Sequence, residues 1–297
     1  MKALVTGGLG FIGSHVADLL VSKGMTVTVL DNLSTGVWEY KNEMVEYVIQ
    51  DILKTEASFF QQFDYIFHLA ALPRIQPSFT EPLEHEEANV IATIKILESV
   101  KNSPQLKKLV FSASSACYGT PKNTPTTELE PVDPLSPYAL QKYAAEQYCI
   151  MLGQMFQIPT VCLRYFNAYG PRSFNPKNKY NAYTSVIGIF HQQRSNNEML
   201  TITGDGAQQR DFVHVFDIAE ANFAAAVSDK FHQIYNVGFG ECISILDAAK
   251  LFNHPYTFIP ERKGESMITL ADISKIKKDL NWSPKLNLLQ GIETYNQ

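Results

Sequence analysis

Tyr138 and Lys142, four residues apart, are the side chains whose types and spacing point most directly to chemistry. On a helix, residues separated by four positions face the same side. Ser136 and Pro137 directly precede Tyr138 and suit the N-cap and the first turn of such a helix. A lysine ammonium near a phenol favours the phenolate and lowers the phenol pKa, which is about 10 in an unperturbed tyrosine. The pair predicts a tyrosine that acts as a base near neutral pH, and a solvent-exposed helix face is the alternative.

A glycine-rich stretch over residues 6–14 lies between a predicted strand and a predicted helix. Residues 3–5 form an apolar run typical of a buried strand, and apolar side chains then repeat at helical spacing over residues 12–20. A second strand is predicted over residues 26–30. Strand, glycine turn, helix and strand in this order form the unit that binds dinucleotides in doubly wound sheets.

The spacing of Gly7, Gly10 and Gly13 within this turn predicts a binding site for a pyrophosphate. Glycines let the backbone approach the phosphates, whose negative charge is stabilised at the helix N-terminus. Asp31 follows the second strand, where it can accept a hydrogen bond from a ribose 2′-hydroxyl and repel a 2′-phosphate. The unit therefore favours NAD over NADP, and a turn used only for tight packing is the alternative.

The chain continues to alternate between strands and helices. Strands are predicted over residues 45–49, 65–69, 108–111 and 160–164, and helices over 81–100 and 137–155. Repeated units of this kind form a parallel sheet with helices on both faces, and ligands bind at the carboxyl ends of its strands. Residues that follow the strands should then meet at one rim, namely the glycine turn, Asp31, Asp51, Ala70, Ser114 and residues 165–167.

Beyond Asn167 the alternation loosens into short strands and loops, which predicts a smaller lobe that closes over the rim. The predicted fold class is α/β, a Rossmann-type doubly wound parallel sheet with a smaller, discontinuous C-terminal substrate lobe. Residues 1–166 with about 206–240 are expected to form the NAD-binding Rossmann domain. Residues 167–205 with 241–297 are expected to form the substrate lobe.

Composition excludes several classes of function. The formal net charge is −5 and no stretch is rich in lysine or arginine, which argues against a nucleic-acid partner. No apolar run of about 18 residues exists, so no membrane span is expected. The 4 cysteines are scattered without a Cys-x-x-Cys pair, which is typical of reduced thiols in a cytoplasmic protein and indicates no metal site.

Seven motifs follow one another along nearly the whole chain. They are Thr6-Gly-Gly-x-Gly-Phe-Ile-Gly-Ser14, His68-Leu-Ala-Ala71, Ser112-Ala-Ser-Ser-Ala-Cys-Tyr-Gly119, Ser136-Pro-Tyr-x-x-x-Lys142, Arg164-Tyr-Phe-Asn-x-Tyr-Gly-Pro171, Gly204-Asp-Gly-x-Gln-x-Arg-Asp-Phe-Val-His214 and Tyr235-Asn-Val-Gly238. Together they resemble the extended short-chain dehydrogenase/reductase superfamily, in its NAD-dependent nucleotide-sugar epimerase/dehydratase family. Within that family the chain is most similar to UDP-glucose/UDP-N-acetylglucosamine 4-epimerases.

The resemblance implies a role for each matching residue. Tyr138 resembles the catalytic base, Lys142 its partner and a ligand of the nicotinamide ribose, and Ser114 the hydroxyl that hydrogen-bonds the sugar 4′-oxygen. The implied NAD-binding residues are Gly7, Gly10, Phe11, Ile12, Gly13, Asp31, Asn32, Asp51, Ile52, Leu69, Ala70, Ala71, Tyr138, Lys142 and Tyr165. The implied substrate-binding residues are Ser78, Ser114, Asn167, Arg210, Arg262 and Thr269. The family also implies a homodimer through the helices over residues 81–100 and 137–155.

The reactions of the family differ, and two positions discriminate between them. Sugar 4,6-dehydratases carry acids, and uronate decarboxylases a glutamate, where this chain has Ser115 and Ala116. The missing acid favours an isomerase that performs 4-epimerisation. Tyr138 would take the 4′-hydroxyl proton while C4 delivers hydride to NAD, and the transient 4-keto sugar would then receive hydride on its other face.

Three further residues bear on the substrate. Thr269 lies where epimerases limited to glucose and galactose tend to hold a tyrosine, and its small side chain leaves space for a 2-N-acetyl group. Gln76 replaces an arginine that is frequent in uronate epimerases, which argues against a carboxylate substrate, and Arg74 is left without a role. The expected substrates are UDP-Glc/UDP-Gal and UDP-GlcNAc/UDP-GalNAc.

Several alternatives remain open at this point. Cys117 lies near the position of a catalytic cysteine in GDP-sugar 3,5-epimerases, but one residue out of register, so we interpret it as a small apolar residue. A UDP-glucuronate 4-epimerase, a 4,6-dehydratase or a 4-reductase would have the same motifs. A non-catalytic NAD-binding regulator is the alternative from another class, because a fold does not determine a function.

Overall fold

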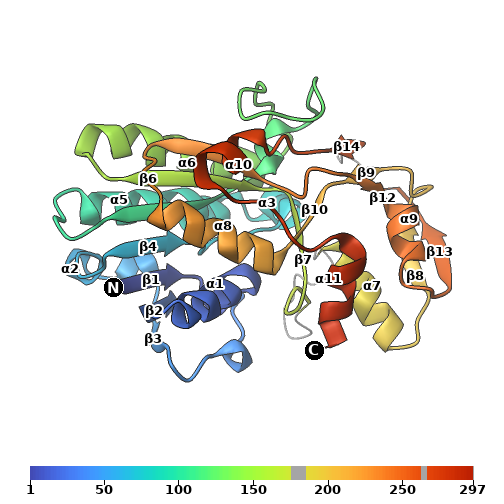
Figure 1. Cartoon of the computed structure of the whole chain (residues 1–297), viewed down its shortest axis with the longest axis horizontal. Helices are drawn as coiled ribbons and strands as arrows, with labels where there is room; N and C mark the ends of the chain where they lie inside the picture. The colour runs from blue at the N-terminus through green and yellow to red at the C-terminus, as the bar shows by residue number, and fades with distance from the viewer. Residues whose placement is uncertain (175–184, 262–265, 297) are drawn as a thin grey trace.

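The main sheet of the protein has seven strands, all parallel (Figure 1). The computed structural model describes residues 1–174, 185–261 and 266–296. The strand order is β11-β6-β5-β4-β1-β2-β3. The strands are β1 (Lys2–Thr6), β2 (Thr26–Asp31), β3 (Glu46–Ile49), β4 (Tyr65–His68), β5 (Lys108–Ser114), β6 (Thr160–Tyr165) and β11 (Gln233–Val237).

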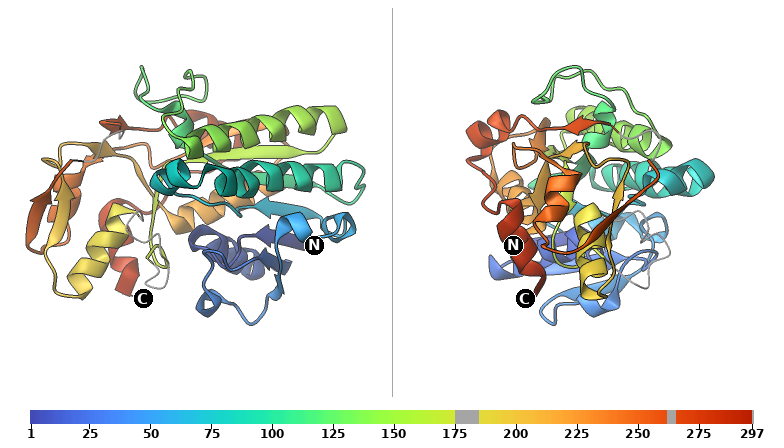
Figure 2. Two further views of the ribbon diagram at one scale, coloured as in Figure 1. Left: turned by 180° about the vertical axis from the view of Figure 1, so that it is seen from behind. Right: turned by 90° about the vertical axis from the view of Figure 1, so that its right-hand side faces the viewer.

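Helices cover both faces of this sheet. On one face lie α1 (Phe11–Ser22) and α8 (Val215–Val227), which are in front in Figure 1, and on the other lie α5 (Ala92–Val100) and α6 (Pro137–Phe156), which are in front in the left view of Figure 2. Alternate residues of the central strands point to opposite faces of the sheet and pack in two apolar cores. Ala3 and Val5 lie on the α1/α8 side, and Leu4 lies on the α5/α6 side. The predicted doubly wound parallel sheet is confirmed.

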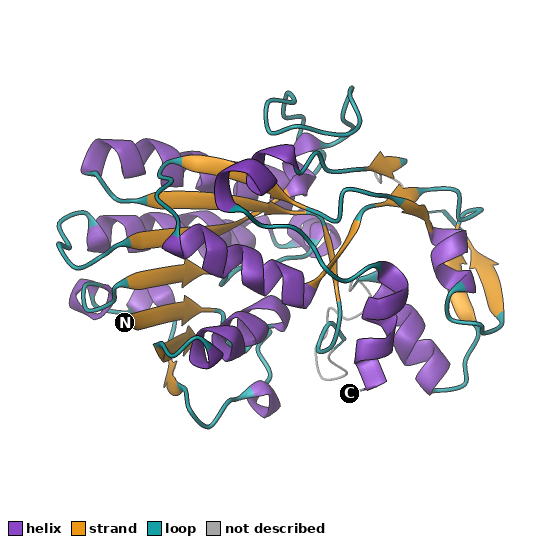
Figure 3. Ribbon diagram, in the orientation of Figure 1, coloured by secondary structure: helices purple, strands orange, loops and turns teal. Residues whose placement is uncertain are grey.

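Outside the main sheet, small sheets and short helices form what we call the C-terminal lobe, on the right in Figure 1 and visible as short strands in Figure 3. Its buried Tyr169, Phe190 and Phe252 belong to a third apolar core. Its strands are β7 (Asn167–Tyr169) paired with β10 (Phe212–His214), β8 (Leu200–Thr203) with β13 (Tyr256–Ile259), and β9 (Gln209–Arg210) between β12 (Ile243–Ser244) and β14 (Ile268–Thr269). Its helices are α7 (Val186–Ser195), α9 (Ile245–Lys250) and α11 (Leu288–Glu293). The remaining α-helices are α2 (Ala57–Phe60), α3 (Ile75–Thr80), α4 (Pro82–Glu86) and α10 (Ser274–Leu280).

The helix predicted over residues 81–100 consists of three consecutive helical segments. Between α4 and α5 the segment Glu87–Ile91 is a π-helix, an irregularity that apolar periodicity cannot reveal. The buried Asn89 in this segment accepts a hydrogen bond from the backbone N–H of Leu72, at 2.8 Å. The π-turn thus ties the helix to the loop that follows β4.

The start of α6 follows the sequence closely. The Ser136 hydroxyl accepts a hydrogen bond from the Ala139 backbone N–H at 3.2 Å, and Pro137 occupies the first turn. The predicted N-cap is confirmed, and Tyr138 therefore lies at the very beginning of the helix.

Among the described helices, none combines the length and the apolar character that crossing a membrane requires.

Candidate active site

One cavity of about 730 Å³ extends along the carboxyl ends of the main strands and is also lined by residues of the C-terminal lobe. The residues that were expected to meet at this rim line it, namely Gly7, Gly10, Gly13, Asp31, Asp51, Ala70, Ser114 and residues 165–167. The predicted convergence is confirmed, because a parallel sheet places the ends of all its strands at one edge.

The glycine turn leaves no room for side chains. Gly7 has a φ of 70°, and a Cβ atom added to it would lie 2.7 Å from backbone atoms of Ala70. A Cβ atom on Gly13 would collide with the Gly7 carbonyl oxygen. Gly10 is the N-cap of α1 and supplies no side-chain cap, so the first N–H groups of the helix are left for an external anion. This arrangement fits a dinucleotide pyrophosphate.

Asp31 holds two loops of the cavity wall together. Its carboxylate accepts hydrogen bonds from the backbone N–H groups of Leu9 (3.0 Å) and Leu33 (2.8 Å). Burial raises the pKa of this carboxyl group, and the two hydrogen bonds oppose that rise. A carboxylate has further acceptor capacity, so these contacts leave Asp31 able to accept from a ribose.

The neighbouring wall is formed by Asn32, Asp51 and Ile52, which all line the cavity. The Asn32 amide donates to the Asp51 carboxylate at 2.9 Å, and Asp51 also accepts from the Leu53 backbone N–H at 2.8 Å. The other residues expected to contact NAD also line the cavity, namely Phe11, Ile12, Leu69, Ala71, Tyr138, Lys142 and Tyr165. The Tyr165 hydroxyl is bonded to the Asn222 amide at 2.8 Å, so only the rest of its side chain faces a ligand.

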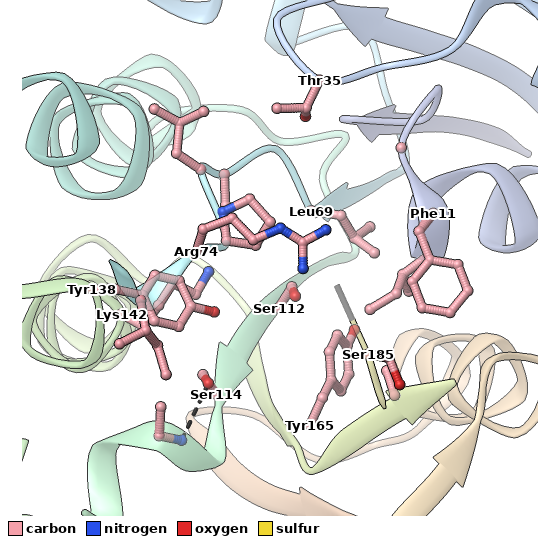
Figure 4. A pocket seen from close by; sticks show the side chains of 18 of the residues that line it. Phe11, Thr35, Leu69, Arg74, Ser112, Ser114, Tyr138, Lys142, Tyr165 and Ser185 are labelled. Atoms are coloured by element: carbon pink, nitrogen blue, oxygen red, sulfur yellow. Dashed lines mark hydrogen bonds between the residues drawn. The ribbon is translucent and has the colours of Figure 1, made fainter. Parts of the chain in front are cut away.

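Tyr138 and Ser114 come together from different elements. Ser114 is the last residue of β5, and its hydroxyl also accepts from the Ala116 backbone N–H at 3.2 Å. Both hydroxyl groups point into the cavity (Figure 4), and Ser114 favours ionisation of Tyr138 by lowering its pKa. The β5 strand was predicted to end at Phe111, but it continues to Ser114 because Ser114 pairs with Tyr165 of β6.

Burial is the main influence on the ionisation of Tyr138. Burial raises the Tyr138 pKa, while Ser114 and the positive charge of Arg74 oppose the rise. The Lys142 ammonium lies 4.3 Å from the centre of the Phe111 ring, and burial lowers its pKa to about 8. The role of Lys142 as the pKa partner of Tyr138 stays a prediction.

At the lobe side of the cavity, Asn167, Arg210 and Thr269 line the wall together. The Asn167 amide donates to the Thr269 hydroxyl at 2.9 Å, and the Arg210 guanidinium donates to the Ser266 carbonyl at 2.7 Å. Strand pairing between β14 and β9 places Thr269 opposite Arg210. Arg262, the other expected ligand of this region, lies outside the described residues.

Ser78 is not where it was expected. It is fully buried, does not line the cavity, and its hydroxyl accepts from the Tyr138 backbone N–H at 3.1 Å while donating to the Ile75 carbonyl at 2.6 Å. The prediction that Ser78 binds substrate is not confirmed, because one hydrogen bond of its hydroxyl holds the start of α6 and the other turns back to Ile75 of α3. Ser78 thus fixes the backbone of Tyr138 from the side of α3, outside the cavity.

Several lining residues carry no signal in the sequence. Arg172 faces the cavity, pairs with Asp18 at 2.8 Å and lies 5.5 Å from the centre of the Tyr40 ring. These residues come from three separate segments, so no local pattern unites them.

Cys117 is 1% exposed, and burial raises its pKa to about 12, which disfavours a thiolate and agrees with its interpretation as a small apolar residue.

Gly13→Ala is expected to abolish the binding of NAD, because the new Cβ atom would collide with the Gly7 carbonyl and open the turn. The NAD released from purified protein by acid can be measured by chromatography. Ser14→Ala is the matched control, since this residue is next to Gly13 and its hydroxyl only bonds back to the Phe11 carbonyl at 3.1 Å. Wild-type NAD content in Gly13→Ala, with an unchanged melting temperature, would contradict the assignment of the turn.

The comparisons with known proteins agree with this geometry. Residues 3–238 match the family model of the NAD dependent epimerase/dehydratase family. A UDP-glucose 4-epimerase of Lactobacillus helveticus is 32% identical over 96% of this chain and 92% of its own length.

Two solved structures are similar over nearly their whole length. A UDP-N-acetylglucosamine 4-epimerase from Methanobrevibacter ruminantium M1, in complex with UDP-N-acetylmuramic acid, has a TM-score of 0.92 and 35% identity, covering 99% of this chain and 98% of that one. A UDP-glucose 4-epimerase from Thermotoga maritima, with UDP-glucose, has a TM-score of 0.92 and 33% identity, covering 100% of this chain and 98% of that one. With the family match, the glycine turn and the Ser114 and Tyr138 hydroxyls in one cavity, these likenesses lead to one conclusion: the chain belongs to the NAD dependent epimerase/dehydratase family, and its cofactor is NAD.

Proposed function

We propose that the protein is an isomerase that catalyses the NAD-dependent 4-epimerisation of a UDP-hexose through a transient 4-keto sugar. The observation that carries this function is that the Ser114 and Tyr138 hydroxyls both point into the cavity that also contains the glycine turn. The similarity to 4-epimerases that act on UDP-sugars supports the same reaction.

In this proposal Tyr138 takes the proton of the sugar 4′-hydroxyl and later returns it. The Ser114 hydroxyl binds the same oxygen and orients it towards Tyr138. Bound NAD supplies the hydride chemistry at C4. Ser115 and Ala116 place no acid directly after Ser114, which argues against loss of water from the sugar. The acid–base chemistry of the protein then consists of the transfer of one proton from the sugar 4′-hydroxyl to Tyr138 and its later return.

The cofactor residues belong to the same proposal. Gly7, Gly10 and Gly13 hold the pyrophosphate of NAD, Asp31 the adenosine ribose, and Lys142 the nicotinamide ribose. The backbone turn without side chains and the uncapped start of α1 support the first of these assignments.

For the substrate, we assign Asn167 and Arg210 to the nucleotide-sugar phosphates, since both line the lobe side of the cavity. A guanidinium binds phosphate oxygens through two parallel hydrogen bonds, which makes Arg210 the stronger of the two ligands. Thr269 is the residue that leaves space for a 2-N-acetyl group, so UDP-Glc/UDP-Gal and UDP-GlcNAc/UDP-GalNAc are the proposed substrates.

The roles of the two domains, the homodimer and the location in the cell are also proposals. Residues 1–166 with about 206–240 hold NAD, and residues 167–205 with 241–297 hold the nucleotide sugar. A homodimer through residues 81–100 and 137–155 is supported by exposed apolar side chains on both, including Leu83 (80%) and Met155 (70%). The cytoplasm is the proposed location, supported by four cysteines that are all free thiols.

Incubation of the purified protein with UDP-Glc or UDP-GlcNAc is expected to yield an equilibrium mixture of each sugar with its 4-epimer, because the 4-keto sugar can receive hydride on either face while Tyr138 returns the proton to its oxygen. Proton NMR of the anomeric signals follows both reactions. UDP-glucuronate, tested separately, is expected to remain unchanged. A stable 4-keto-6-deoxy sugar as product, or turnover of UDP-glucuronate alone, would contradict the proposed function.

A further inference from the structure

Asp211 lies behind the lobe side of the cavity. It joins β9 to β10 and is fully buried, and it does not line the cavity, although its chain neighbours Arg210 and Phe212 both do. A carboxylate is stable in such a place only where hydrogen bonds satisfy its oxygens. Because Asp211 does not line the cavity, any effect that it has on the reaction must pass through its neighbours.

The Asp211 carboxylate accepts backbone hydrogen bonds from two separate segments. One oxygen accepts from the Phe239 N–H at 2.6 Å, and the other accepts from the N–H groups of Gly240 and Ala271, both at 3.0 Å. Phe239 and Gly240 follow β11, the edge strand of the main sheet, whereas Ala271 follows β14 of the C-terminal lobe (Figure 1). The carboxylate thus ties the strand that carries Thr269 to the end of the main sheet.

The backbone of Asp211 fixes the residues that line the lobe side of the cavity. Its N–H donates to the Thr269 carbonyl at 2.9 Å, and its carbonyl accepts from the Asn167 backbone N–H at 3.1 Å and from the Asn167 amide at 2.9 Å. Arg210 precedes Asp211 in the chain and pairs with Thr269 across β9 and β14. One buried residue therefore determines the relative positions of Asn167, Arg210 and Thr269.

The surroundings of the carboxylate allow little variation. A Cβ atom added to Gly238 would lie 2.7 Å from an oxygen of Asp211 and 2.6 Å from the Ala271 side chain. Burial raises the pKa of Asp211 to about 6, and the backbone hydrogen bonds oppose the rise. Above this pH the group is a carboxylate, which only accepts hydrogen bonds and matches the N–H groups around it.

We propose that Asp211 is a positioning residue for the nucleotide sugar, because it holds Asn167, Arg210 and Thr269 in the arrangement that receives the substrate. This inference rests on the proposed function, in which these residues bind the phosphates and leave space for the 2-substituent of the sugar. The hydroxyl groups that act on the sugar 4′-oxygen belong to β5 and α6, and none of the hydrogen bonds of Asp211 named above involves either element. Asp211 should therefore affect substrate affinity and leave the chemical step and NAD binding unchanged.

The test compares Asp211→Asn with Asp217→Asn as a matched control. Asparagine has the size of aspartate, but its NH2 group would face backbone N–H donors and weaken their hold. Asp217 is also a buried carboxylate that accepts from backbone N–H groups, those of Lys285 at 3.0 Å and Leu286 at 3.1 Å, but none of these three residues lines the cavity. Both variants should lower the melting temperature, and only Asp211→Asn should lower substrate affinity.

For Asp211→Asn we expect the KM for UDP-Glc to rise about tenfold, with kcat within about twofold of the wild type and an unchanged NAD content. Calorimetric titration with UDP, which needs no turnover, should show a similar loss of affinity. The assays are run well above pH 6, where the Asp211 carboxyl group is ionised. Wild-type KM and UDP affinity in Asp211→Asn would overturn the proposal, and so would an equal rise of KM in Asp217→Asn, which would assign the effect to stability alone.

Gly238→Ala tests the same contact if Asp211→Asn does not fold, because the added Cβ atom would displace the Asp211 carboxylate and Ala271. This variant should also bind UDP more weakly and keep its NAD, and wild-type UDP affinity would again overturn the proposal. If UDP-hexoses are not turned over by the wild type, the proposed function fails, but the titration with UDP still decides the role of Asp211.

Discussion

Tyr138→Phe is expected to lower kcat for 4-epimerisation by about 10³-fold, because general-base catalysis contributes about 10²- to 10⁴-fold and a phenyl ring cannot accept a proton. The substitution removes one oxygen from a side chain whose hydroxyl points into the cavity, and it leaves the backbone bond between Tyr138 N–H and Ser78 in place. NAD content and KM should therefore stay close to those of the wild type. Steady-state assays with UDP-Glc measure kcat and KM, and chromatography of the bound cofactor measures the NAD content.

Tyr143→Phe is the matched control for this variant. Tyr143 lies on the same helix, but it packs against the apolar core and does not line the cavity. It should keep its activity. Turnover of Tyr138→Phe within tenfold of the wild type would refute Tyr138 as the base, whereas loss of NAD would show that the hydroxyl mainly binds the cofactor.

Arg164→Met is expected to lower the free energy of unfolding by about 3–5 kcal/mol, the typical cost of removing one partner from a buried ion pair. The Arg164 guanidinium forms two hydrogen bonds of 2.7 Å with the Glu146 carboxylate, and the two side chains are only 3% and 1% exposed. Without Arg164, the Glu146 charge stays buried without a partner. Glu146 lies one turn after Lys142 on α6.

Urea denaturation measures the loss, and two further variants identify its origin. The double variant Arg164→Met/Glu146→Leu should recover much of the stability, because no buried charge is then left unpaired. Lys250→Met breaks the exposed pair with Asp247 and should leave the unfolding midpoint unchanged, since exposed pairs contribute little. A loss below about 1 kcal/mol in Arg164→Met would show that Glu146 finds another partner or takes up a proton.

Much of the site could be predicted from local patterns. The N-cap Ser136, the glycine turn and Asp31 depend on neighbours within a few residues, and the structure places them as expected. The convergence of strand ends follows from the parallel topology alone, because each β-α unit adds its strand in the same direction. Motifs of this kind therefore indicated the fold, the cofactor and the identity of the two reactive hydroxyls.

Sequence patterns did not predict features that depend on packing between segments far apart in the chain. Ser78 was expected to bind substrate, but the docking of α3 against α6 buries it behind Tyr138. The contact of the Lys142 ammonium with the ring of Phe111 in β5 also joins residues that no local pattern relates. The extension of β5 to Ser114 likewise depends on its pairing with β6.

Local patterns in the chain identify the side chains that could react and the elements on which they lie, because caps, turns and periodicity depend on near neighbours. Which groups surround each hydroxyl depends on packing between distant segments. The pKa of Tyr138 depends on burial and on charges brought in from other segments, and neither is encoded in the spacing between Tyr138 and Lys142.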